Sequence, residues 1–454
     1  MALSRTGAQL DTLLKELGDG LVMRRGTVED ADALADFQAI TNSSTEEPDE
    51  GIRHWTRDMA SGGMPGFDPS DFTIVEDSAT GVIASSLNLI SQTWTYGGVE
   101  FGVGRIELVA THPNYRRRGL VRAQMEVVHE WSAARGEMVQ AITGIPWYYR
   151  QFGYEMALEH AGGRSGEALN DVPDRAGQVE QFTLRPATLE DLPFASRLYE
   201  RGAERHLVSC VRGDEMWRYD LDGRSEDGTH RREMCMIEDR AGRLVGCLLH
   251  AGALWGTKLA ATLFELEPDV SWEAVTPSVV RYLSETGREY AARNGGGFDA
   301  VLWGLSSEHP AYEVSGLMPH AERPYAWYLR VTDVPAFVSR IAPVLEDNLS
   351  SSRAAGYSCD LKISFVGDGL RMAFEDGRLT AAERWMPTQL DSRLTARVRD
   401  ALFPDLTFLQ LLVGFRSVED LEYAFPDCRA SSDGARGLLN SLFPKRVSSV
   451  WGIE

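Results

Sequence analysis

The fold is decided by the stretch 106–122, which reads Ile106-Glu107-Leu108-Val109-Ala110-Thr111-His112-Pro113-Asn114-Tyr115-Arg116-Arg117-Arg118-Gly119-Leu120-Val121-Arg122. Its first six residues are typical of a strand, and the pattern predicts a helix from about 122 to 135. A turn between strand and helix points several backbone N–H groups at one spot, where the helix dipole adds positive potential. Gly119 allows an anion to approach the main chain, and the arginines add charge. The stretch predicts a pyrophosphate cradle. The alternative, a basic helix start on an acidic surface, does not account for the flanking strand and helix.

The sequence on either side of this stretch contains an internal repeat. Residues 23–30, Met-Arg-Arg-Gly-Thr-Val-Glu-Asp, match residues 184–191, Leu-Arg-Pro-Ala-Thr-Leu-Glu-Asp. In both copies we expect a short strand, then a Thr that caps a helix with acidic residues in its first turn. Hairpin patterns around 75–84 and 237–245 follow at nearly the same offset. Tyr149 and Gly153 then align with Tyr312 and Gly316.

These matches predict an α/β (α+β) chain with three domains. We place the first domain at 1–165, the second at 182–330 and the third at 331–454. The third lacks the repeat and is expected to be α+β. Its helical patterns lie at 334–349, 392–402, 408–413 and 432–443, and its strand patterns at 361–365 and 370–374. Pro343 is expected to kink or shorten the first of these helices.

Composition narrows the range of partners. The chain has 454 residues, with 46 Lys and Arg against 67 Asp and Glu, which gives a net charge of −21. Such an acidic surface disfavours binding to nucleic acid and to anionic membranes, and it leaves polycationic small molecules possible as partners. The need for solubility alone also explains the charge. We expect no signal peptide, and no stretch reaches the roughly 18 apolar residues of a membrane span. Five widely spaced cysteines without a CxxC favour a reducing cytoplasm, and scattered histidines without an HExxH predict no metal.

The motif from Arg116 to Val121 resembles the acetyl-CoA motif of GNAT-type N-acetyltransferases, Arg/Gln-x-x-Gly-x-Gly/Ala, with Val121 in the last position. The chain is still more similar to the enhanced-intracellular-survival (Eis-like) family of aminoglycoside acetyltransferases. That family's Arg-Arg-Arg-Gly-Leu-Leu-Arg corresponds to 116–122, and its Tyr-Gly-Arg-Phe-Gly-Tyr to 149–154. The resemblance implies tandem GNAT-like folds followed by a sterol-carrier-like domain. It also implies acetyl-CoA as cosubstrate, a small-molecule amine as acceptor, and a homo-oligomer, which is a hexamer in that family.

The resemblance also assigns the site residues. It places acetyl-CoA against Val109, Ala110, Thr111, Arg116, Arg117, Arg118, Gly119, Leu120, Val121, Arg122, Gly144 and Ile145. It makes Tyr149 the general acid that protonates the leaving thiolate, whose ordinary pKa is about 8.5. It makes the terminal carboxylate, here Glu454, the base. The competing interpretations are aromatic packing around a tight turn for Tyr149 and a frayed tail for Glu454.

The second copy lacks the cradle. After Leu266 it reads Glu267-Pro268-Asp269-Val270-Ser271-Trp272-Glu273, with no glycine and three acids where phosphates would bind. Like charges repel, so we expect one acetyl-CoA site per chain.

Three functions remain open from the sequence. The first is acetyl-CoA-dependent N-acetylation of an amine, such as a multi-amine aminoglycoside. Its acceptor cleft would be bordered by an acidic segment, Glu46, Glu47, Asp49 and Glu50, although the composition of this segment favours a solvated loop. The second is acetylation of a protein lysine or another metabolite. The third is a lipid-binding carrier that uses the GNAT units as scaffold. The intact cradle favours an enzyme, and no sequence feature identifies the acceptor.

Overall fold

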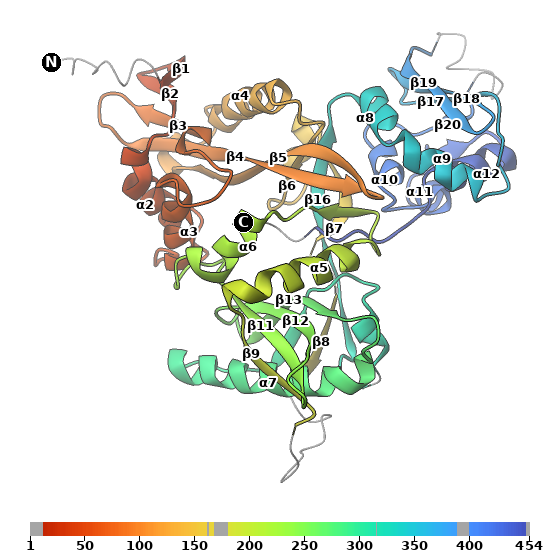
Figure 1. Ribbon diagram of the computed structural model, residues 1–454. Coiled ribbons are helices and arrows are strands. Elements are labelled where there is room, and N and C mark those ends of the chain that lie inside the picture. Colours follow the sequence, from red (N-terminus) through yellow and green to blue (C-terminus); the bar gives the residue numbers. More distant parts are fainter. Residues whose placement is uncertain (1–11, 161–162, 168–179, 315, 388–398, 451–454) are drawn as a thin grey trace.

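The chain folds into three units, each built on its own β-sheet. The computed structural model describes residues 12–160, 163–167, 180–314, 316–387 and 399–450. In the view of Figure 1 the first unit lies at the upper left, the third at the upper right and the second below them. The predicted α/β (α+β) class is confirmed.

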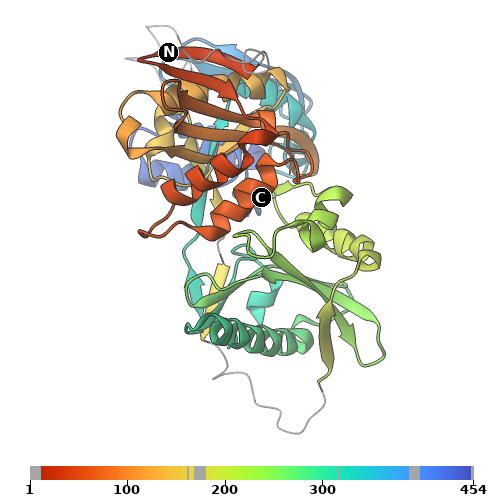
Figure 2. The ribbon, with the colours of Figure 1, turned by 90° about the vertical axis from the view of Figure 1, so that its left-hand side faces the viewer.

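The first unit has a mixed sheet with helices on both faces. In spatial order its strands are β1 (Leu13–Gly18), β2 (Leu21–Arg25), β3 (Phe72–Asp77), β4 (Ile83–Tyr96), β5 (Val99–Thr111), β6 (Val139–Ile142), β16 (Tyr325–Val331) and β7 (Glu155–His160), and β10 (Val208–Cys210) pairs with the end of β4. One face is covered by α2 (Ala31–Thr41) and α3 (Glu50–Ala60), and the other by α4 (Leu120–Ala134). Figures 1 and 2 show these layers.

The second unit repeats this plan. Its sheet contains, in spatial order, β15 (His320–Glu322), β8 (Gly163–Glu167), β14 (Ala300–Trp303), β13 (Lys258–Leu266), β12 (Leu244–Ala251), β11 (Arg232–Asp239) and β9 (Phe182–Pro186). Its helices are α5 (Leu192–Ala203), α6 (Asp214–Arg218) and α7 (Trp272–Asn294). In Figure 1 the long α7 lies on the side of this sheet away from the first unit.

The predicted repeat is visible in side-chain detail at the start of each unit. In the first copy Thr27 and Asp30 form a capping box, and Arg24 donates to both oxygens of Asp30 at 2.7 Å. In the second copy Thr188, Asp191 and Arg185 make the same contacts. The bond from Arg185 lowers the pKa of Asp191 to about 2, so the second pair is ionised at neutral pH. One local sequence therefore encodes the same turn twice.

Strands cross between the two units. β16, which follows the second unit in the chain, lies between β6 and β7 of the first sheet. β8, which precedes the second unit, pairs with β14 and β15 of the second sheet. The boundary predicted at 165 lies within β8, which is in the second sheet, and the boundary predicted at 330 lies within β16, which is in the first. Sheet membership differs from chain order because Trp327, Tyr328 and Leu329 are buried in the first sheet.

The third unit has a small sheet covered by short helices. Its strands in spatial order are β19 (Arg378–Trp385), β18 (Gly369–Glu375), β17 (Asp360–Ser364), β20 (Ala401–Leu402) and β21 (Arg429–Ala430). Its helices are α8 (Val334–Arg340), α9 (Ala342–Ser350), α10 (Phe408–Leu412), α11 (Val418–Ala424) and α12 (Asp433–Leu442). As expected for Pro343, the first helical pattern is interrupted: α8 ends before Ile341, and the proline lies in the first turn of α9.

One predicted helix in this unit is wrong over its last residues. Ala401 and Leu402 are strand β20, which pairs in parallel with Ile363 and Ser364 of β17. The rest of that prediction lies mostly at 388–398, outside the described residues. Just before β20, the Asp400 carboxylate accepts from the Lys362 backbone N–H at 2.8 Å. This long-range pairing overrides a local helical pattern.

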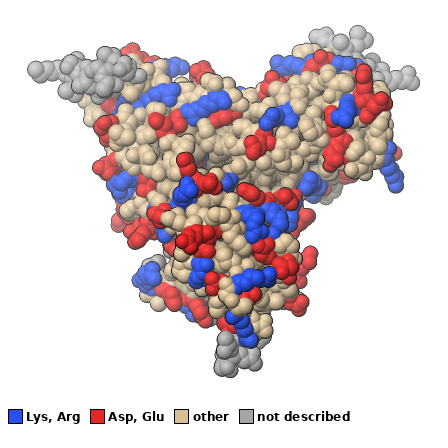
Figure 3. All heavy atoms as spheres, viewed as in Figure 1, with Lys and Arg blue, Asp and Glu red and all other residues tan. Residues whose placement is uncertain are grey.

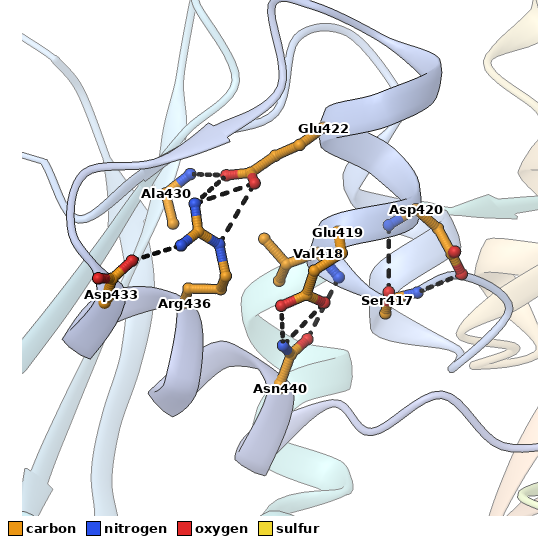
Figure 4. A network of polar contacts seen from close by, with 9 residues as sticks. All are labelled: Ser417, Val418, Glu419, Asp420, Glu422, Ala430, Asp433, Arg436 and Asn440. Atoms are coloured by element: carbon orange, nitrogen blue, oxygen red, sulfur yellow. Dashed lines mark hydrogen bonds and ion pairs between the residues drawn. The ribbon is translucent and has the colours of Figure 1, made fainter.

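A polar network joins two helices of the third unit (Figure 4). Arg436 of α12 pairs with Glu422 of α11 at 3.0 Å, and Asn440 donates to the Glu419 carboxylate at 2.8 Å.

The third unit also packs directly on the first. The Tyr96 hydroxyl of β4 donates to the Leu412 carbonyl at 2.9 Å, and one apolar core runs through both units. Arg150, in the loop between β6 and β7, also lies 3.4 Å from Asp405 of the third unit.

Candidate active site

A groove in the first unit runs between the end of β5, the start of α4 and the loop after β6. Its volume is about 1120 Å³. Its lining comprises Thr41, Asn42, Val109, Ala110, Thr111, Tyr115, Arg116, Arg117, Arg118, Gly119, Leu120, Val121, Arg122, Ile145, Tyr148, Gln151 and Phe152. All of the cofactor residues expected from the sequence lie here except Gly144, which directly precedes Ile145. A contiguous stretch of sequence and one distant loop thus form a single concave surface.

The backbone along this groove is open to a ligand. Pairing between β5 and β6 ends at Arg105 and Ala141, although β5 continues to Thr111. Beyond that point, within the described residues, β5 has no strand partner on that side. Gly119 caps α4 with φ +75°, and a Cβ built on it would meet no atom within 4 Å. The N-terminus of α4 therefore presents free N–H groups to open space.

The arginines of the groove contact mainly neutral groups, although Arg118 interacts electrostatically with Asp77. Arg122 donates to the Gln151 side chain at 2.8 Å and lies over the Phe152 ring, while Arg118 lies over Tyr115. Among the residues that the structure describes, no carboxylate forms an ion pair with Arg116, Arg117, Arg118 or Arg122. Unpaired guanidinium groups at a helix N-terminus, on a chain of net charge −21, form a local site for an anion.

Tyr149 lies beneath the groove, outside its lining. It is only 3% exposed, and its ring packs edge-on against Tyr148 and Tyr328 with centroids 5.2 and 5.8 Å away. Its hydroxyl is 4.0 Å from the place of a Cβ on Gly144. No hydrogen bond to the Tyr149 hydroxyl is found within the described part of the chain. This hydroxyl is therefore available to a ligand near Gly144.

The neighbouring tyrosines have structural partners. Tyr154 bonds His129 at 2.7 Å, Tyr328 accepts from the Trp147 N–H at 2.6 Å, and Tyr325 donates to the Gly144 carbonyl.

Burial, and next the charge of Glu107, raise the pKa of Tyr149 above its usual range. A buried phenol of raised pKa remains protonated at neutral pH, so the Tyr149 hydroxyl carries a proton there.

In the second unit, the residues that directly follow β13 differ from those of the groove. Glu267, directly after β13, accepts from Arg197 at 2.6 Å and from Arg201 at 3.1 Å. Glu265 is buried and bonded to Arg205. The acids at the end of β13 are therefore bonded to arginines of their own unit. Tyr312, the counterpart of Tyr149, donates its hydroxyl to the Trp303 carbonyl at 2.9 Å.

Several groove residues were not expected from the sequence. Thr41 and Asn42 end α2, and Tyr148, Gln151 and Phe152 belong to the loop before β7. The Tyr-x-x-Phe-Gly motif could have indicated Tyr148 and Phe152, but nothing local connects α2 to this groove. The predicted base Glu454 lies outside the described residues, which end at Val450 in this part of the chain.

The acidic segment near α3 is partly used by the fold. Asp49 caps α3 by accepting from the Ile52 N–H at 2.9 Å, and Glu50 pairs with Arg53.

Over the face drawn in Figure 3, acidic and basic side chains are interspersed. Among the described residues, no group of three or more His, Cys, Asp or Glu side chains is placed to hold a metal ion. None of the described helices is long and apolar enough to cross a membrane.

Comparison with known proteins agrees with this geometry. Residues 23–157 match the family model of the acetyltransferase (GNAT) domain. The first unit is a GNAT acetyltransferase domain. By this domain the protein is an N-acetyltransferase, and such domains take acetyl-CoA as acetyl donor. The comparison with curated proteins returns no significant match.

Solved structures share the fold over nearly the whole chain. A conserved protein of unknown function from Enterococcus faecalis V583, a probable N-acyltransferase, is 13% identical with a TM-score of 0.63, over 95% of this chain and 99% of that one. A GCN5-related N-acetyltransferase from Kribbella flavida is 18% identical with a TM-score of 0.62, over 95% and 99%. Eis1 from Mycobacterium abscessus is 15% identical with a TM-score of 0.55, over 98% and 99%. The GNAT domain is therefore embedded in an architecture known from other proteins.

Proposed function

We propose that the protein transfers the acetyl group of acetyl-CoA to an amine at the groove of the GNAT domain. This proposal rests on four arginines beside Gly119, at the N-terminus of α4, for which no ion pair with a carboxylate is found among the described residues. These groups suit a pyrophosphate. The open edge of β5 at Val109, Ala110 and Thr111 suits the amides of a pantetheine arm, with Gly144 and Ile145 on the opposite side.

In this proposal Tyr149 supplies the proton that the reaction needs. Bound acetyl-CoA supplies a thioester whose carbonyl carbon can accept an amine. The amine nitrogen bonds that carbon, the carbon–sulfur bond breaks, and Tyr149 gives its proton to the departing thiolate. The amine loses one proton to a base, and water returns a proton to the tyrosinate. One proton leaves the amine and one reaches the thiolate, so the protons balance over one turnover.

The base is proposed to be the terminal carboxylate, which belongs to Glu454, as the family resemblance implies. The position of the preceding chain supports this. Val450 is buried, and its carbonyl accepts from the Trp327 indole N–H at 3.1 Å. The Trp327 ring in turn lies 5.0 Å from the Arg105 guanidinium of β5. The described chain therefore ends beside the strand that borders the groove.

The acceptor is proposed to be a small multi-amine molecule, such as an aminoglycoside, with a protein lysine or another metabolite as the alternative. The net charge of −21 supports a cationic acceptor. We further propose a cytoplasmic homo-oligomer, hexameric by family resemblance, with a sterol-carrier-like third unit.

The lipid-carrier alternative would use a second groove, between the end of β16 and the third unit. Its volume is about 1330 Å³. Its lining includes Phe365, Leu406 and Phe408, but also charged Asp333, Asp368, Arg384 and Asp405. Burying such charges against a lipid is costly. The enzyme is therefore the better supported function.

Acetyl-CoA is expected to raise the melting temperature of the protein, and Gly119→Glu is expected to abolish this shift. A ligand at 100 times its dissociation constant stabilises the folded state by about 2.7 kcal/mol. A glutamate at Gly119 places a negative charge where the phosphates would bind. Differential scanning fluorimetry with and without acetyl-CoA measures both effects.

Gly119→Ala is the matched control. It has the same backbone strain at φ +75° but no charge, so it should keep most of the thermal shift. A full shift in Gly119→Glu would contradict the cradle assignment, and no shift in the parent protein would contradict the proposed function.

The chain is expected to bind one acetyl-CoA. In the second unit Glu267 is already bonded to Arg197 and Arg201, so no anion site remains at that position. Isothermal titration calorimetry should give a stoichiometry of one per chain. Two sites per chain would show that the second unit has retained a cofactor site.

A further inference from the structure

Strand β5 carries a bulge where it enters the groove. Ser86 of β4 pairs with Ala110 and Asn88 pairs with Glu107, so two residues of β5, Leu108 and Val109, face one residue of β4. Leu108 has φ +51°, in the left-handed region that non-glycine residues rarely occupy. Such a conformation persists only where surrounding contacts enforce it.

A buried glutamine holds this bulge. Gln38 of α2 has no exposed surface, and its side-chain amide donates to the Leu108 carbonyl at 2.7 Å and to the Ser86 hydroxyl at 3.0 Å. Asn42 donates to the Gln38 side-chain oxygen at 2.5 Å and itself lines the groove. A continuous set of hydrogen bonds therefore runs from the groove wall to the strained residue.

We propose that Gln38 is a positioning residue for acetyl transfer, which holds the β5 bulge in the conformation that receives the thioester carbonyl. This inference rests on the proposed function, because it needs acetyl-CoA along β5. Val109, directly after the bulge, lines the groove. Rotation of the Leu108 peptide would turn the following main chain away from the ligand. Backbone donors that stabilise a developing oxyanion must be held in place before the reaction.

The position of the strain accounts for this role. Elsewhere in the described part of β5 the strand is paired regularly with β4. The left-handed residue stands only where the partner strand β6 has ended and the groove begins. A fold that needed only a stable sheet would gain nothing from a bulge at that point, since regular pairing costs less.

The test compares acetyl-CoA with CoA, because only acetyl-CoA has the thioester carbonyl. In Gln38→Leu we expect acetyl-CoA affinity to fall about tenfold and kcat about 10- to 100-fold. The affinity for CoA, which keeps the phosphates and pantetheine arm, should change less than about twofold. Calorimetry with both ligands and steady-state kinetics measure these values.

Gln124→Leu is the matched control. Gln124 of α4 is equally buried, donates to Thr73 at 2.9 Å and accepts from Ser85 at 2.6 Å, but it lies on the other face of the sheet. It should lose comparable stability and keep the acetyl-CoA to CoA affinity ratio of the parent. An unchanged ratio in Gln38→Leu, or an equal change in Gln124→Leu, would overturn the inference.

Asn42→Ala covers the case in which Gln38→Leu does not fold. This exposed side chain can be removed without a buried cavity, and it frees the Gln38 amide to rotate. We expect the affinity ratio to shift in the same direction by about threefold, and no shift would count against the inference. If the parent protein binds neither acetyl-CoA nor CoA, the proposed function fails first, which separates the two outcomes.

Discussion

Replacing Tyr149 by Phe is expected to lower kcat by about 10²- to 10⁴-fold and to leave acetyl-CoA affinity nearly unchanged. The substitution removes one hydroxyl and keeps the ring that packs between Tyr148 and Tyr328. The proton is needed only as the thiolate departs, so the loss should appear in kcat more than in KM. Release of free CoA thiol under saturating acetyl-CoA and amine measures kcat.

Two other tyrosines provide the controls. Tyr148→Phe changes the neighbouring ring, which lines the groove, and should keep kcat within a few-fold. Tyr312→Phe removes the hydroxyl that bonds the Trp303 carbonyl in the second unit, so it should cost about 1 kcal/mol of stability and no activity. A large kcat loss in Tyr148→Phe together with a normal Tyr149→Phe would transfer the proton donor to Tyr148.

The pH profile provides a further readout for the same tyrosine. Burial and the nearby Glu107 raise the pKa of Tyr149 above its usual range, so the group holds its proton at any pH below about 10. Because the folded-state pKa is the higher one, ionisation opposes folding only when the pH rises above the unfolded value. We therefore expect no fall of kcat below pH 10 from loss of the Tyr149 proton. A fall near pH 8 would indicate a different donor.

The sequence predicted the strand, turn and helix of 106–134 well because these parts are contiguous. Strand, turn and helix from 106 to 134 depend on local alternation, a capping glycine and an amphipathic helix, and the structure places them in one groove. The capping boxes at Thr27 and Thr188 are equally local. Turn chemistry and helix capping act over a few residues, so one sequence is enough to read them.

The strand exchange and much of the site could not be read in this way. β16 joins the first sheet from a distant part of the chain, and it brings Tyr325 to the Gly144 carbonyl and Tyr328 to the Trp147 N–H. Gln38 reaches the Leu108 carbonyl across 70 positions. Such contacts depend on the packing of whole layers, which leaves no periodic trace in the sequence. The residues that position the site were therefore the ones that local patterns could not reveal.

Replacing Trp327 by Ala is expected to destabilise the first unit by about 3–5 kcal/mol and to abolish acetyl-CoA binding at moderate temperature. Trp327 is fully buried on β16, the strand that joins β6 to β7. Its ring packs edge-on against Trp94 with centroids 5.8 Å apart, and the Arg105 guanidinium lies 5.0 Å away. The substitution leaves a cavity at β16, the strand from the later part of the chain that joins β6 and β7 in the catalytic sheet. Urea denaturation followed by tryptophan fluorescence measures the loss.

Trp303→Ala in the second unit provides the comparison for this prediction. Trp303 of β14 is 1% exposed and also fills the core of its sheet, so its removal should cost a similar free energy of unfolding. The catalytic sheet does not contain β14, so acetyl-CoA affinity at low temperature should stay within about twofold of the parent. Loss of less than about 1 kcal/mol in Trp327→Ala, with normal acetyl-CoA binding, would show that the first unit does not depend on β16. Equal loss of binding in both variants would show instead that the two units unfold together, so that the second unit supports the catalytic one through the strands they exchange.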